Sequence, residues 1–118
     1  MINGVHAIIY TKAPDEVRTF FRDVLGLSSV DAGHGWLIFA LPPAELGVHP
    51  SDDESFHELY LLCDYIHATV EELKGKGVEF SRPLSEQAWG FVTSIRMPGG
   101  GELGLYQPKH PTAIQLGM

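Results

Sequence analysis

The sequence contains little cysteine, few basic residues and no long apolar run. Cys63 is the only cysteine among the 118 residues, so no disulfide can form within the chain. No segment reaches the roughly 20 apolar residues of a membrane-spanning helix, and the first residues lack the basic and apolar regions of a signal peptide. The 15 Asp and Glu outnumber the 8 Lys and Arg, which gives a formal net charge of −7. Because this charge repels phosphate backbones and anionic membranes, we expect a protein that binds neither nucleic acid nor membrane. The lack of a targeting or membrane segment makes a cytoplasmic location the default expectation.

The first half of the chain predicts a strand, a helix and three further strands. β-Branched and aromatic residues favour a strand over Gly4–Tyr10. Pro14 and the two acidic residues after it are typical of a helix start, and an apolar stripe from Val17 to Leu25 predicts one buried helix face. Gly26 suits the left-handed position that ends such a helix. The three strands are expected at about 27–31, 36–41 and 44–49.

The second half predicts the same order of elements. A strand is expected over His57–Cys63, and Ile66, Val70 and Leu73 mark a helix stripe that ends at Gly77. Three more strands follow at about 78–81, 90–97 and 101–107, and a polar loop precedes the second of them.

The two halves align well enough to indicate an internal duplication. Twenty positions separate His6 from Gly26 and also His57 from Gly77. The last strand of each half carries Glu-Leu-Gly, at residues 45–47 and 102–104. We therefore predict a single α+β domain, 1–118, made of two tandem βαβββ units at about 4–50 and 55–107. The units would form a cupped, partly closed mixed sheet with the helices outside and a ligand on the concave face.

Strand alternation predicts which side chains point into the cup. Glu102, Gly104 and Tyr106 should share one face of the last strand. His6, Ile8 and Tyr10 should lie on the concave side, with Ala7 and Ile9 beneath the first helix. Tyr60 and Leu62 are expected beneath the second helix, which leaves the concave side to His57, Leu59, Leu61 and Cys63.

These features resemble the vicinal oxygen chelate superfamily, which includes glyoxalase I, bleomycin and fosfomycin resistance proteins, and extradiol dioxygenases. The resemblance covers about residues 4–108. It is carried by His6, Phe20-Phe21, Val24–Leu27, His57, Leu73, Gly77–Phe80 and Pro98 to Pro108. Such a fold hosts several chemistries, so the resemblance implies the architecture more strongly than the activity.

In metal-dependent members of this superfamily, strand-opening histidines and a glutamate hold a divalent ion. The resemblance thus implies His6 and His57 as ligands of one ion, such as Zn, Ni, Mn or Fe. The position of the glutamate falls on Gly104, however, and on Gly47 in the first half. Glu102 is the nearest candidate ligand or general base, although two residues of strand displace it by about 6.6 Å.

Glycine at both positions also admits a different interpretation, in which the missing side chains leave room for a ligand. The walls of that space would be His49, Tyr10, Trp36, Phe91 and Tyr106. The chain would then be a small-molecule-binding protein, with catalysis through a divalent metal left open. The alternatives are a metal-dependent lyase or dioxygenase acting on a substrate with two adjacent oxygens, and a purely dimerising or regulatory domain. By analogy with the superfamily we expect a homodimer.

Overall fold

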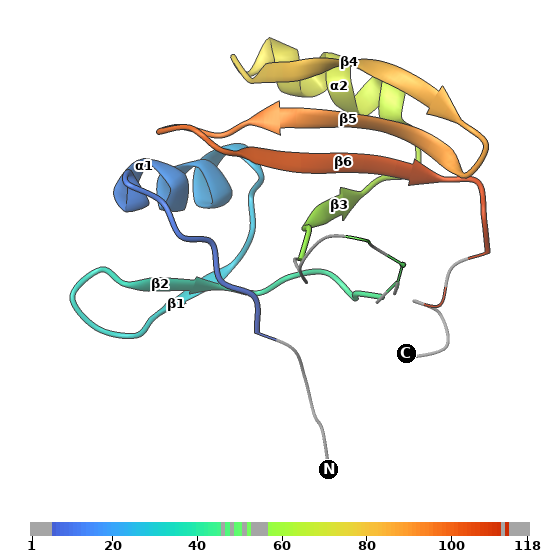
Figure 1. Cartoon of the computed structure of the whole chain (residues 1–118). Helices are drawn as coiled ribbons and strands as arrows, with labels where there is room; N and C mark the ends of the chain where they lie inside the picture. Colours follow the sequence, from blue (N-terminus) through green and yellow to red (C-terminus); the bar gives the residue numbers. More distant parts are fainter. Residues whose placement is uncertain are drawn as a thin grey trace.

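The computed structural model describes residues 6–45, 47, 49–50, 52, 57–111 and 113. Its elements run in the order α1 (Pro14–Thr19), the π-helical turn η1 (Phe20–Val24), β1 (Ser29–Asp31), β2 (Leu37–Phe39), β3 (Tyr60–Leu62), α2 (Ile66–Gly75), β4 (Glu79–Gln87), β5 (Gly90–Arg96) and β6 (Glu102–Pro108). Figure 1 shows the hairpin β1–β2 standing apart from the larger sheet. The α+β class is therefore confirmed.

The second half forms the complete βαβββ unit that the sequence predicts. Its four-stranded sheet has the order β3-β6-β5-β4, in which β3 runs parallel to β6 and the other neighbours are antiparallel. The parallel pair needs a long connection, and α2 with the two strands after it provides this. The turn Pro98–Gly101 joins β5 to β6 through three glycines with positive φ, of +78°, +96° and +87°.

The first half forms a helix and a two-stranded antiparallel sheet. The turn between β1 and β2 is held by the Asp31 carboxylate, which accepts hydrogen bonds from the backbone N–H groups of Gly33 and Gly35. No strand occurs within residues 6–10, nor between residues 40 and 59 where the structure describes the chain. The strands expected at 4–10 and 44–49 are thus wrong for these residues, whereas residues 4, 5, 46 and 48 lie outside the described part. In the second half, β3 forms a strand because it pairs with β6. Among the described residues of the first half, no strand pairs with residues 6–10 in the same way.

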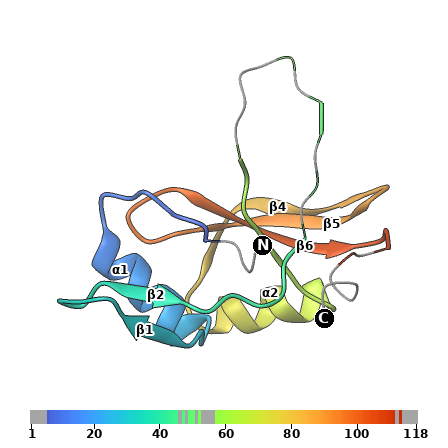
Figure 2. The same ribbon diagram turned by 90° about the horizontal axis from the view of Figure 1, so that it is seen from below.

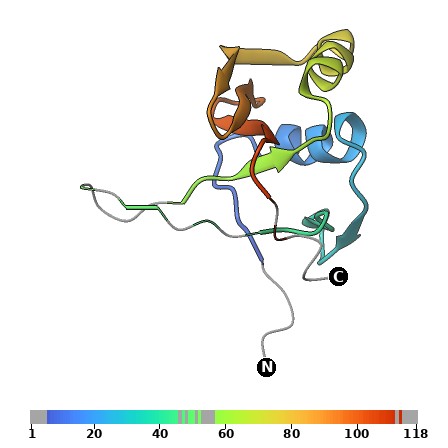
Figure 3. The same cartoon turned by 90° about the vertical axis from the view of Figure 1, so that its right-hand side faces the viewer.

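Both helices bury the faces that the apolar stripes predict. Val17, Phe20 and Phe21 join the α2 stripe and residues of β5 and β6 in one core. Figures 2 and 3 show α1 and α2 on the same side of the four-stranded sheet. Gly26 and Gly77 end the helical segments with φ of +70° and +85°, as expected for left-handed terminal residues. Neither helix is long and apolar enough to cross a bilayer.

Strand β4 is longer than the sequence predicts. It continues from Glu79 to Gln87, through the stretch expected as a polar loop. It lies at the edge of the sheet, where Pro83 costs no ladder hydrogen bond on the solvent side. Two register shifts relative to β5 accommodate the extra residues around Arg82.

The facing of β3 is opposite to the prediction. Leu59, Leu61 and Cys63 pack against the core, whereas the Tyr60 ring lies over Gly104 on the other face of the sheet. Every residue from 59 to 63 is apolar or aromatic, so alternation within this segment carries no polar marker. Glu58, just before this segment, is polar and lies two positions before Tyr60. Alternation therefore places Tyr60 on the same face as this charged residue, away from the core.

Candidate functional site

The face of the four-stranded sheet that lies opposite the helices carries the candidate site, and we call it the open face. Leu103 and Leu105 of β6 are buried on the helix side. Glu102, Gly104 and Tyr106 alternate with them, so they share the open face as predicted. Figure 3 shows this face turned away from both helices.

Three aromatic rings meet on the open face and form what we call the aromatic cluster: Tyr60, Trp89 and Tyr106. The Tyr106 ring lies between the other two, with ring centroids 6.0 Å from Tyr60 and 5.3 Å from Trp89. Both contacts are edge-to-face, which is a favourable geometry for aromatic pairs. Tyr60 and Trp89 remain 40% and 46% exposed. The cluster therefore combines a fixed arrangement with ring surface that a ligand can reach.

Two glycines make room for these rings. A Cβ on Gly104 would overlap the ring of Tyr60, and a Cβ on Gly90 would lie 2.5 Å from Cε2 of Tyr106. The space predicted at Gly104 is thus filled by the chain's own Tyr60. The glycine lets an aromatic ring lie flat on the backbone of β6.

A polar group adjoins the Tyr60 end of the cluster. The Tyr60 hydroxyl donates to Glu58 over 2.5 Å, and this hydrogen bond raises the pKa of Tyr60. Arg82 extends from β4 across β5 to place Nη2 3.3 Å from the Glu102 carboxylate on β6. The nearby Ser81 hydroxyl, with further help from Arg82, lowers the pKa of Glu102. A carboxylate with a lowered pKa is a weaker base, so this environment disfavours Glu102 as a general base.

The segment after β6 reaches from the cluster to the first half of the chain. The Tyr106 hydroxyl donates to the carbonyl oxygen of Trp89 at 3.2 Å and also contacts the His110 ring. Burial raises the pKa of Tyr106. Three residues after His110, the backbone N–H of Ala113 donates to Glu45 at 2.7 Å.

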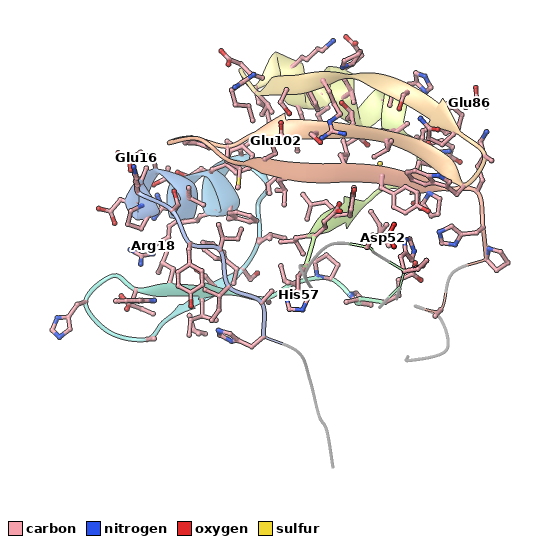
Figure 4. The ribbon with its side chains drawn as sticks, in the orientation of Figure 1. Glu16, Arg18, Asp52, His57, Glu86 and Glu102 are labelled. Atoms are coloured by element: carbon pink, nitrogen blue, oxygen red, sulfur yellow. The ribbon has the colours of Figure 1, made fainter. Side chains whose placement is uncertain are left out.

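The residues proposed as metal ligands do not assemble into a binding group. His6 and His57 are both exposed and lie outside the strands. In Figure 4, His57 lies where the chain enters β3, whereas Glu102 lies at the start of β6 and pairs with Arg82. Within the described part of the chain, no three His, Cys, Asp or Glu side chains come together in a way that could hold a metal ion. This donor set does not fit a divalent ion, and we derive no chemistry through one.

The other residues expected to line a ligand space are dispersed. Tyr10 is 89% exposed and lines a surface pocket of about 560 Å³ beside Gly99–Gly101. Trp36 is exposed beneath the Arg18 guanidinium, 5.2 Å from its ring, and Phe91 lies against His67 on the helix side. The remaining two, Gly47 and His49, are exposed neighbours outside any strand. Of the predicted lining residues, Tyr106 and Gly104 are the two that belong to the open face around the aromatic cluster.

Sequence reasoning missed Tyr60, Glu58 and Arg82 as site residues. The signal that could have assigned Tyr60 to the open face is the charged residue Glu58, which lies two positions earlier and so shares its face. Arg82 had no such signal, because the strand was expected to end at about residue 81, before a polar loop. Trp89 was recognisable only as a residue after that loop.

Comparison with known proteins agrees with this architecture. Residues 5–105 match the Glyoxalase/Bleomycin resistance protein/Dioxygenase superfamily. No curated protein matches the sequence.

Solved structures with the same fold include proteins of different function. TnmS3, an antibiotic binding protein from Streptomyces sp. CB03234, is 23% identical with a TM-score of 0.67, over 92% of this chain and 98% of that one. Lactoylglutathione lyase from Agrobacterium tumefaciens is 12% identical with a TM-score of 0.62, over 89% and 92%. A superfamily member from Sphaerobacter thermophilus DSM 20745 is 22% identical with a TM-score of 0.61, over 90% and 98%. Since the family match spans most of the sequence, the chain belongs to the glyoxalase/bleomycin resistance protein/dioxygenase superfamily.

Proposed function

We propose that the protein binds a small aromatic molecule on the open face of its four-stranded sheet, by stacking on the aromatic cluster. The observation that carries this proposal is the contact of Tyr106 with both Tyr60 and Trp89, while the outer two rings stay partly exposed. Aromatic rings on a rigid strand offer large contact area, because few rotatable bonds must be fixed on binding.

Superfamily membership supports small-molecule binding, and the similar fold of an antibiotic binding protein is consistent with it. A similar fold is also found in a lactoylglutathione lyase, so the fold alone favours neither binding nor catalysis. We prefer binding for two reasons. Glu102 is already paired with Arg82, and the two positions where the superfamily resemblance places a metal-binding glutamate are glycines in this chain, Gly47 and Gly104.

Fluorescence titration of a single-tryptophan protein tests the proposal. Trp36→Phe removes one of the two tryptophans and leaves Trp89 within the cluster as the reporter. A neutral aromatic probe, 2-naphthalenemethanol, should quench Trp89. Tyr106→Ala should weaken this binding about five- to tenfold, because aromatic contacts contribute about 0.5–1.5 kcal/mol each.

Tyr65→Ala is the matched control, since it removes an exposed tyrosine that lies outside the cluster. Equal affinity in Tyr106→Ala and Tyr65→Ala, or no quenching in the parent protein, would refute the proposal.

The metal-dependent alternative has its own measurement. Elemental analysis compares the wild-type protein, purified without added metal, with a His6→Ala/His57→Ala double variant. Stoichiometric Zn, Ni, Mn or Fe in the wild-type protein alone would restore that alternative, and equal content would remove it.

We also propose a homodimer built from this single domain. An open sheet face encloses a ligand poorly, and small-molecule sites usually bury most of the ligand surface. The first half presents large apolar side chains to solvent, namely Ile8, Tyr10, Val30, Trp36, Ile38 and Leu41. A second copy that covers these side chains would also support the two-stranded β1–β2 sheet, which is marginal alone. Sedimentation equilibrium should give twice the mass of 13.0 kDa, and a monomer at micromolar concentration would contradict this.

The cytoplasmic location expected from the sequence stays a prediction.

A further inference from the structure

A second hollow lies at the β4 edge of the sheet and shares Arg82 with the polar group beside Tyr60. This edge pocket, of about 510 Å³, is lined by Lys74, Val78, Glu79, Phe80, Arg82, Pro83 and Arg96. Its volume lies in the range of small-molecule sites. The residues come from the end of α2, from β4 and from β5, all of which belong to the complete second unit.

The lining of the edge pocket is richer in cations than the chain as a whole. The whole chain carries a net charge of −7 and 8 Lys and Arg. Three of these cations, Lys74, Arg82 and Arg96, line one pocket, against the single acid Glu79. Val78, Phe80 and Pro83 supply its apolar surface.

The three cations are available for a ligand because their present partners hold them weakly. Lys74 lies 4.0 Å from Glu71 and Arg96 lies 3.8 Å from Glu79, and the Arg82–Glu102 pair is the shortest at 3.3 Å. All of these side chains are more than half exposed. Exposed ion pairs contribute about 0–1 kcal/mol, so a ligand anion can replace them at little cost.

We propose that the edge pocket binds a small organic phosphate with an apolar group. The two guanidinium groups would hold the phosphate oxygens through paired N–H donors, a geometry that arginine offers and lysine does not. Lys74 adds a third charge from the helix, and Phe80 with Val78 receives the apolar part. None of the three rings of the aromatic cluster lines this pocket, so the proposal does not depend on the proposed function.

A purely protective role for these charges makes a different prediction. Charged residues and proline on an edge strand can serve only to prevent pairing with another chain. In that case the charges would act without a ligand, and neutral or anionic probes would affect the edge pocket equally.

Two-dimensional ¹H–¹⁵N NMR titration with phenyl phosphate tests the proposal. The probe should shift the amide signals of residues 78–82 and 96, whereas benzyl alcohol, its uncharged counterpart, should not. Arg96→Gln and Lys74→Gln should each weaken phenyl phosphate binding about fivefold, and raising NaCl from 20 to 200 mM should weaken it in the wild-type protein.

Lys76→Gln is the matched control, because Lys76 is the basic residue next to Lys74 but does not line the edge pocket. Weaker binding in Arg96→Gln and Lys74→Gln, with wild-type binding in Lys76→Gln, would support the proposal. Equal weakening in all three variants would overturn it, since the effect would then be one of net charge. Shifts of equal size with benzyl alcohol, or no shift of these amides at about 10 mM phenyl phosphate, would overturn it as well.

Discussion

Replacement of Gly104 by alanine tests the arrangement of the open face most directly. Gly104 has an ordinary strand conformation, so alanine is allowed by its backbone. The new Cβ would nevertheless overlap the base of the Tyr60 ring, and that ring would have to leave β6. The edge-to-face contact of Tyr60 with Tyr106 would be lost with it.

The magnitude follows from these contacts. Overpacking costs about 1–3 kcal/mol, and the lower part of that range applies because Tyr60 is partly exposed and can swing outward. The aromatic contact contributes about 0.5–1.5 kcal/mol, while replacing glycine in a strand returns about 0.5–1 kcal/mol. We expect Gly104→Ala to lower the free energy of unfolding by about 1–2 kcal/mol.

A double-mutant cycle in urea denaturation isolates this contact. In a Tyr60→Ala background the clash is absent, so Gly104→Ala should be neutral or stabilising by about 0.5 kcal/mol. Gly75→Ala is the control, since Gly75 lies within α2 with nothing near its Cβ, and it should stabilise by about 0.5–1 kcal/mol. If Gly104→Ala costs the same with and without Tyr60, the placement of the Tyr60 ring is wrong.

Three further predictions concern single residues. Glu58→Gln should bring the raised pKa of Tyr60 back toward 10.0, measured by NMR titration of its ring, because the hydrogen bond to a charged acceptor is lost; an unchanged pKa would contradict the contact. Glu102 has a lowered folded-state pKa, so its contribution to stability is present above its usual value of 4.5 and is lost as the pH falls below that value. Urea denaturation of Glu102→Gln between pH 6 and 3 should therefore show a smaller loss of stability on acidification than wild type, and parallel curves would argue against a lowered pKa of Glu102. Gly77→Ala should lower the free energy of unfolding by about 1–2 kcal/mol in the same assay, because φ is +85° there; a neutral effect would contradict that conformation.

The sequence predicted the elements of the second half well. The stripe Ile66, Val70, Leu73 identified the buried face of α2, and Gly77 marked its end, since both signals are local and depend only on helix geometry. The shared face of Glu102, Gly104 and Tyr106 also followed from alternation in a single strand.

Predictions that required a partner strand or a face assignment fared less well. The first strand of the duplication was expected at 4–10, but its described residues have no neighbour to pair with, and pairing is what makes an extended segment a strand. Strand β4 was underestimated because polar residues and Pro83 are typical of loops, yet an edge strand tolerates both.

For the candidate site, too, some features followed from the sequence and others depended on the tertiary structure. The sequence by itself determined the family, the two helix faces and the alternation of β6, because these depend on residue type and period along a continuous stretch. The tertiary structure alone decided that Tyr60 meets Tyr106 and that Arg82 reaches Glu102 across β5. These contacts depend on which strands become neighbours and on their register, and a one-residue change of register moves every side chain to the opposite face.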